Sequence, residues 1–97
     1  MYQQGDLILL ETEKVKGKRL DHLILAYGEA TGHHHRIATG QATLSEENGT
    51  LYLRVDSNKA DLVHEEHGKI TIPKGDYLVR RVREFDHFAE KARAVRD

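Results

Sequence analysis

The stretch that decides the fold class is Thr50-Leu51-Tyr52-Leu53-Arg54-Val55-Asp56. Its aliphatic side chains occupy every second position, with tyrosine, arginine and aspartate between them. Because successive side chains of a strand point to opposite faces, this period predicts a half-buried β-strand. The Asn48-Gly49 pair just before the stretch predicts a tight turn.

The residues on either side extend the β pattern. Strands are expected at residues 7–10, 20–27, 69–72 and 77–85, with a break at 57–59 and a turn at 73–76. The tail differs, because Asp86 can cap a short helix whose apolar stripe includes Phe88 and Val95. We therefore predict one mainly β domain over residues 1–97. It would be a small β-barrel or sandwich with a β core over about 5–85 and a short C-terminal α-helix over about 86–96.

Composition limits the kinds of function that are open to the chain. It has 97 residues, 15 lysines and arginines, 16 aspartates and glutamates, and no cysteine. A formal net charge of −1 disfavours a protein that coats polyanions, although residues 69–97 alone are net basic. The lack of cysteine excludes disulfides and thiolate metal sites. There is no apolar run near about 18 residues and no signal-peptide pattern, so we expect a cytoplasmic protein without membrane spans.

Histidines in two tight pairs are the best clue to a site. The first pair is His33 and His35, in the run Gly32-His33-His34-His35-Arg36. On a strand both share the face of Ile37, which should seek the core, so they are predicted to line a pocket while His34 points to solvent or to a partner subunit. Two imidazoles on one face can chelate an ion or act as an acid and a base. A structural role as hydrogen-bonded core residues is the alternative.

The second pair, His64 and His67, encloses Glu65 and Glu66 and is followed by Gly68. The two histidines share a face in a helix, or in a strand that a turn or bulge interrupts. Either glutamate can serve as a metal ligand or fix a histidine tautomer. A charged surface turn is the alternative.

Together the two pairs predict a metal site with His33, His35, His64, His67 and Glu65 as candidate ligands. Four nitrogens suit a closed tetrahedral site, and three ligands with an open water position suit a catalytic one. Two histidines with one carboxylate would suit iron. Zinc, nickel or iron fit these donors better than magnesium or calcium.

The last predicted strand adds a phenol and two guanidinium groups. Tyr77, Arg81 and Arg83 share a face if the strand is regular. Guanidinium groups near histidines disfavour a bare dication and favour an anionic substrate, such as RNA or a small phosphate ester. One of the four histidines would be the base and another the acid, with Tyr77, Arg81 and Arg83 holding the phosphate. Tyr77 is thus a catalytic candidate, and Arg81 and Arg83 are candidates for substrate binding. Surface ion pairs are the alternative for these arginines.

Three segments carry a resemblance to a known family. They are Gly28-Glu29-Ala30-Thr31-Gly32-His33-x-His35, His64-Glu65-Glu66-His67 and Ile72-Pro73-x-Gly75-x-Tyr77. The pattern resembles a family of small bacterial and phage-associated proteins with no assigned activity. It covers about the central half of the chain and implies a natural compact domain without supplying a function.

At the level of architecture the chain is also similar to the cupins, which are small metal-binding β-barrels. They too have a Gly…His-x-His element and a later Pro-x-Gly turn. Cupins normally continue from that turn to another histidine, where this chain has Tyr77. The glutamate that follows their His-x-His has no clear counterpart here. The likeness therefore supports the architecture, and the cupin metal site is not carried over.

Three functions remain open from the sequence. The first is a histidine-lined site that binds a divalent transition metal or hydrolyses an anionic substrate there. The second is a metal-independent ribonuclease or phosphodiesterase that uses histidines as acid and base. The third is a non-enzymatic binding module, for which homo-oligomerisation would add to the modest core of so short a chain.

Overall fold

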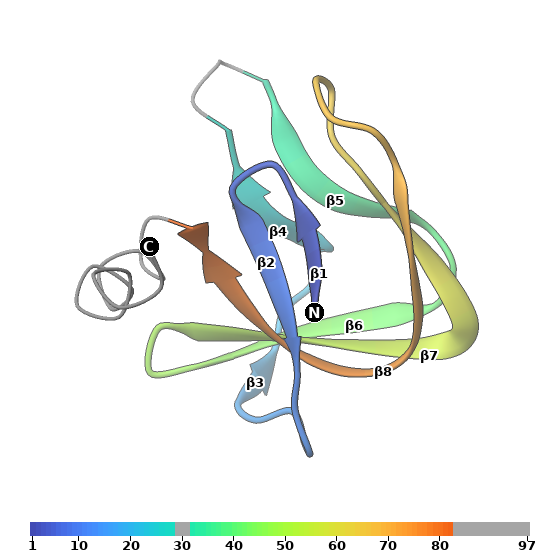
Figure 1. Ribbon diagram of the computed structural model, residues 1–97. Helices are drawn as coiled ribbons and strands as arrows, with labels where there is room; N and C mark the ends of the chain where they lie inside the picture. The colour runs from blue at the N-terminus through green and yellow to red at the C-terminus, as the bar shows by residue number, and fades with distance from the viewer. Residues whose placement is uncertain (29–31, 83–97) are drawn as a thin grey trace, which may run out of the picture.

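The computed structural model describes residues 1–28 and 32–82, and Figure 1 shows that strands dominate them. The strands are β1 Tyr2–Gln4, β2 Leu7–Glu11, β3 Lys18–Arg19, β4 Ile24–Tyr27, β5 His34–Thr39, β6 Ala42–Glu47, β7 Thr50–Val63 and β8 Ile70–Arg81. The mainly β prediction is therefore confirmed. The helix predicted for about 86–96 lies outside the described residues.

All strand pairs are antiparallel, and the long hairpin of β7 and β8 organises them. The order is β1-β2-β8-β7-β5-β4, with β6 also on β7 and β3 beside β6. The first half of β7 pairs with β6 and its second half with β5, so β7 passes from one part of the sheet to another. No ladder joins β1 back to β4 within the described residues. The sheet therefore folds over itself as a sandwich and does not close as a barrel.

The β7–β8 hairpin bends where the sequence predicted a break and a turn. The register shifts between the pairs Val55↔Gly75 and Lys59↔Pro73, so the strands continue through a bulge. A turn at 73–76 was therefore the wrong prediction, because the chain bends there without reversing. Proline lacks an N–H, and a bulge is one of the few places in a sheet that tolerates it. Ser57 stabilises the same bend by accepting a hydrogen bond from the Gln41 backbone N–H at 2.9 Å.

The turn between β6 and β7 forms at the predicted dipeptide. Asn48 and Gly49 have φ values of +51° and +81°, as the tight hairpin turns of twisted sheets require. Leu53 and Val55 then enter the core, while Arg54 between them is exposed. The core residues are Leu7, Leu9, Leu25, Ile37, Leu44, Leu53, Val55, Ala60, Leu62, Ile72, Tyr77 and Val79.

The described part of the chain contains no helix that is long and apolar enough to cross a membrane. Two connections matter for the site described next. The β1–β2 turn and the segment between β7 and β8 both lie in the upper part of Figure 1, where β5 also begins.

Candidate functional site

Four histidine rings gather where β5 begins and β7 ends. His33 immediately precedes β5 and His35 lies in it, and His64 and His67 come from the segment after β7. Ring centroids are 4.3 Å apart for His35 and His64, 4.7 Å for His64 and His67, 5.9 Å for His35 and His67, and 5.8 Å for His33 and His64. The two pairs that the sequence singled out therefore form one group, called the histidine cluster below.

His35 is the buried member of the cluster. Its side chain is 1% exposed, and it lies on the same face of β5 as the core residue Ile37. His35 Nδ1 lies 2.9 Å from Gln4 Oε1. The Gln4 amide nitrogen donates to the carbonyl oxygens of Leu62 at 2.8 Å and Gly68 at 2.9 Å. Since Gln4 Oε1 can only accept, Nδ1 of His35 must carry the proton, and Nε2 of the neutral ring is bare.

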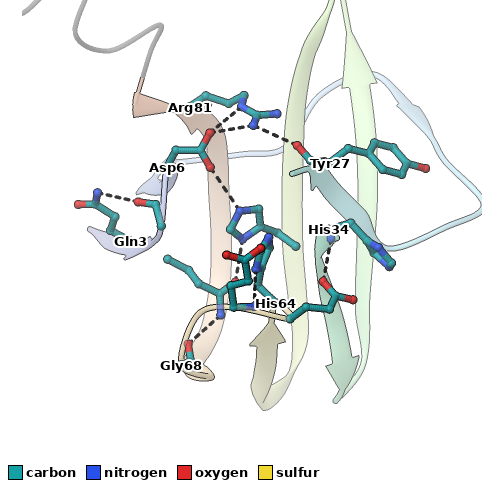
Figure 2. Close-up of polar contacts among 12 residues, drawn as sticks. Gln3, Asp6, Tyr27, His34, His64, Gly68 and Arg81 are labelled. Carbon is teal, nitrogen blue, oxygen red and sulfur yellow. Dashed lines mark hydrogen bonds and ion pairs between the residues drawn. The ribbon is translucent and has the colours of Figure 1, made fainter. Parts of the chain in front are cut away.

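The bare Nε2 of His35 faces a carboxylate. Asp6 Oδ1 lies 3.4 Å from it, and Asp6 Oδ2 accepts from Arg81 NH2 at 2.7 Å. The same Arg81 nitrogen donates to the Tyr27 backbone oxygen at 3.0 Å. Figure 2 shows Asp6 between Arg81 and a histidine ring, with Arg81 reaching across to Tyr27. One guanidinium group thus connects the start of β2 with the ends of β8 and β4.

Burial and neighbouring charges shift the pKa values of this pair. The pKa of His35 is lowered to about 4, chiefly by burial and next by the nearby His64, while Asp6 opposes the shift. Burial raises the pKa of Asp6, but the hydrogen bonds and charge of Arg81 and the contact with His35 bring it below the usual value. At neutral pH the pair is therefore a neutral imidazole beside a carboxylate.

His64 and His67 lie further towards solvent. His64 is half-buried, and its Nδ1 accepts a hydrogen bond from the Glu66 backbone N–H at 3.0 Å, so the neutral ring carries its proton on Nε2. His67 is exposed, and its ring lies against the backbone of Gly5. Gly5 has φ +58°, and a Cβ there would collide with the His67 ring. Glycine at this position therefore serves both the β1–β2 turn and the approach of the ring.

His33 pairs with Glu66 at the exposed edge of the cluster. The carboxylate oxygen Oε2 lies 2.5 Å from His33 Nδ1. The contact does not have hydrogen-bond geometry, and the buried Nδ1 has no hydrogen-bond partner within the described part of the chain. The His33 side chain is 29% exposed and Glu66 is 60% exposed, so this pair meets solvent.

Glu65 points away from the cluster, although it was predicted as a metal ligand. Its carboxylate accepts from the His34 backbone N–H at 2.9 Å and from Arg36 NH1 at 3.0 Å. These bonds hold the pKa of Glu65 at about 2, the His34 N–H having the largest effect. Glu65 therefore anchors the segment after β7 to β5, and Glu66 is the glutamate that reaches a clustered ring. His34 lies outside the cluster with its ring against Tyr27.

The three other predicted site residues have different surroundings. Tyr77 is a core residue, 1% exposed, and its hydroxyl donates to the Pro73 carbonyl oxygen at 2.7 Å, so the structure does not bring it to the histidines. Burial raises its pKa. Arg81 joins the site through Asp6. Arg83 lies outside the described residues.

The spacing of the rings suits a shared ion. With Zn–N bonds of about 2.0–2.1 Å, the centroids of two imidazoles on one tetrahedral ion lie roughly 5 Å apart. The distances among His35, His64 and His67 span that value. As these side chains lie, however, no three histidine, aspartate or glutamate groups in the described ranges are arranged to hold an ion. Binding would require His64 to release the Glu66 amide and the exposed His67 ring to turn.

Three residues around the histidine cluster were not predicted from the sequence: Gln4, Gly5 and Asp6. Gln4 was not singled out, because a single glutamine at the end of a short strand carries no periodic signal. Its side chain is nonetheless buried and reaches residues far along the chain, Leu62 and Gly68. The Gly5-Asp6 pair is a local turn signal before the strand predicted at residues 7–10.

Comparison with known proteins gives a family without an activity. A family model described as a domain of unknown function, DUF8820, matches residues 3–82. No curated protein and no solved structure matches the chain. The match agrees with the predicted membership of a small uncharacterised family, and the likeness to cupins stays a prediction.

Proposed function

We propose, for a chain that belongs to the DUF8820 family of domains of unknown function, that the histidine cluster binds a divalent transition metal ion. The observation that carries this proposal is the mutual approach of His35, His64 and His67, with all three centroid distances between 4.3 and 5.9 Å. Imidazoles are neutral ligands for zinc, nickel and iron, and the chain has no thiolate to compete with them.

The state of His35 supports a role as a ligand. A buried imidazole with a fixed Nδ1–H and a bare Nε2 is the form in which histidine binds metals, with the second nitrogen held by an outer partner. Here the outer partner is Gln4. The gradient from buried His35 to exposed His67 gives an ion a route in from solvent.

Metal content and metal-induced stabilisation test the proposal directly. The protein should be purified without a metal-affinity column and its metal measured by elemental analysis, with about one zinc, nickel or iron per chain expected. After removal of metal with a chelator, a free ion at 100 times its Kd should stabilise the fold by ~2.7 kcal/mol. For a domain of this size that corresponds to a rise in melting temperature of about 10–20 °C.

A matched pair of variants assigns the effect to the cluster. His67→Ala should abolish most of the metal-induced shift, because the exposed ring makes few packing contacts but lies 4.7 Å from His64 by centroid. His34→Ala should keep the shift, because that ring is directed at Tyr27 and outside the cluster. No bound metal and no shift with any of the three ions would overturn the proposal.

A second candidate is metal-independent cleavage of a phosphodiester. It is favoured by the pair His33 and His64, whose rings are 5.8 Å apart. Glu66 stands beside His33, the candidate base, and the Glu66 N–H leaves His64 with a proton on Nε2, from which it could donate a hydrogen bond to a phosphate oxygen. Cleavage of RNA in EDTA, lost in both His33→Ala and His64→Ala, would support this reaction over the metal site. Cleavage retained in both variants would point to a contaminant.

A further inference from the structure

We infer that the β1–β2 turn, Gln4-Gly5-Asp6, completes the metal site: Asp6 binds the same ion as His35, and Gln4 is the positioning residue that fixes the His35 ring. The inference rests on the proposed metal site and adds a carboxylate ligand to it. It also makes the N-terminal hairpin part of the site, alongside the two histidine segments.

The hydrogen bonds of Gln4 leave one assignment for its amide. One terminal atom lies 2.8 and 2.9 Å from two carbonyl oxygens, which only accept, so this atom is the nitrogen and both of its protons are used. The other atom is the oxygen, 2.9 Å from His35 Nδ1. A single buried side chain therefore selects the His35 tautomer and also holds Leu62 and Gly68, which flank the segment that bears His64 and His67.

The distance between Asp6 and His35 fits a shared ion better than a shared proton. Nε2 and Oδ1 are both acceptors when the ring is neutral, and they lie 3.4 Å apart. A hydrogen bond between charged groups would bring them to about 2.7–2.9 Å. Two ligand atoms with bonds of about 2.0–2.2 Å to one tetrahedral ion lie about 3.4 Å apart. Oδ1 of Asp6 is thus placed where a carboxylate ligand beside His35 would be.

The contacts between Arg81 and Asp6 do not use Oδ1, the oxygen that faces His35. Its guanidinium takes Oδ2 of Asp6 through Nε at 3.2 Å and NH2 at 2.7 Å. The carboxylate is thereby oriented with Oδ1 towards His35. Three imidazoles and one carboxylate form a mixed nitrogen and oxygen donor set, which suits zinc, nickel or ferrous iron better than a soft ion such as Cu(I).

Asp6→Asn separates a ligand from a structural carboxylate. The amide can still accept from Arg81 through its oxygen, and its nitrogen can donate to the bare Nε2 of His35. The metal-free variant should therefore melt at or above the wild-type temperature. Its affinity for Zn²⁺, measured by competition with a chromophoric chelator, should fall at least ~10–100-fold, the range known for loss of an outer-shell partner. Asp61→Asn is the matched control, because Asp61 is bound by Thr39 and Thr71 on another face and should bind Zn²⁺ as the wild type does.

The role of Gln4 in fixing the His35 tautomer can be tested in the metal-free protein. In the chelator-treated protein, ¹⁵N NMR should show Nδ1 protonated and Nε2 unprotonated for His35. Gln4→Leu should change that pattern towards an Nε2–H ring and weaken Zn²⁺ binding about 10–100-fold. Gln3→Leu, at an exposed neighbour whose amide donates to the Gly5 carbonyl oxygen, is the control and should change neither.

The outcomes separate the two proposals. Zn²⁺ binding in the wild type with unchanged affinity in Asp6→Asn would overturn the role of Asp6 and leave the histidine site intact. A wild-type His35 with its proton on Nε2 would overturn the role of Gln4, even if Gln4→Leu fails to fold. A wild type that binds no Zn²⁺, nickel or iron would overturn the proposed function itself and the Asp6 ligand with it.

Discussion

Two aspartates of this protein, Asp6 and Asp61, have lowered pKa values for different reasons. Asp61 accepts from the hydroxyls of Thr39 at 2.7 Å and Thr71 at 2.9 Å, with Lys69 at 3.9 Å, so both of its oxygens face donors. Asp6 has one oxygen on Arg81 and the other opposite a ring nitrogen that has no proton to give. The first carboxylate has hydrogen-bond donors for both of its oxygens, whereas the second has one oxygen opposite a ring nitrogen that also accepts while the ring is neutral.

The surroundings of Asp6 and Asp61 also differ. The Asp61 group joins β5, β7 and β8 on the surface by short contacts between neighbouring strands. The Asp6 group joins the N-terminal hairpin to β4, β5 and β8, and it surrounds a buried imidazole. Exposed ion pairs contribute little to stability, whereas buried polar groups cost free energy when they lose a partner. Changes at the buried His35 should therefore cost much more stability than changes at Asp61.

His35→Ala should be the most damaging substitution. It opens a cavity beneath the cluster and leaves Gln4 Oε1 buried without a donor, which together should cost about 3–4 kcal/mol of unfolding free energy. Metal-induced stabilisation should be lost as well. Chemical denaturation of the metal-free protein gives the first value, and a loss below about 1 kcal/mol would contradict the buried, bonded state assigned to His35.

The stability of the metal-free protein should fall as the pH is lowered from 7 to 4. The pKa of His35 is about 4 in the folded protein, against about 6.5 when unfolded, so the unfolded chain binds more protons in this range. The contribution of His35 to the free energy of unfolding is therefore fully present above pH 6.5. It is lost as the pH falls towards 4, by up to ~3 kcal/mol. Denaturation at several pH values should show this slope in the wild type and a shallower one in His35→Ala. Equal slopes would assign the effect to other groups.

How far the sequence predicts this arrangement depends on the range of the contacts. Asn48-Gly49 and the shared face of His35 and Ile37 follow from local backbone preferences and strand periodicity, so both were predictable. The role of Gln4 was not, because its bonds to Leu62 and Gly68 join segments about 60 residues apart. The turn expected at Pro73 failed for a similar reason. Proline signals a break in a ladder, but only the partner strand decides whether that break is a turn or a bulge.

The two glutamates of the second histidine pair show the same limit at short range. Glu65 and Glu66 are adjacent and chemically alike, so spacing alone could not say which faces the histidines. The direction of the chain after β7 decides it: Glu65 binds the His34 N–H and Arg36, and Glu66 approaches His33. The gathering of the histidines was therefore predictable from the sequence, while the glutamate that approaches them was not.

Gly5→Ala should have an intermediate effect. The new Cβ would collide with the His67 ring, and alanine disfavours the φ of +58° at this position. We expect a loss of about 1–2 kcal/mol of unfolding free energy and weaker metal binding, because His67 must move away. Gly49→Ala is the matched control, since its φ is +81° but a Cβ there meets open space. Equal metal affinity in the two variants would show that the position of His67 does not matter for binding.

Asp61→Asn should have the smallest effect, and it tests the comparison from the other side. The amide oxygen can still accept from one threonine hydroxyl and the group lies at the surface, so the melting temperature should stay close to that of the wild type. Because the pKa of Asp61 is lowered by Thr39 and Thr71, its contribution is present at neutral pH and is lost as acid protonates it. Wild type and Asp61→Asn should therefore converge in melting temperature at low pH. Asp61→Asn could instead weaken Zn²⁺ binding as much as Asp6→Asn does. The hydrogen-bond partners of the two carboxylates would then not indicate which one binds the metal.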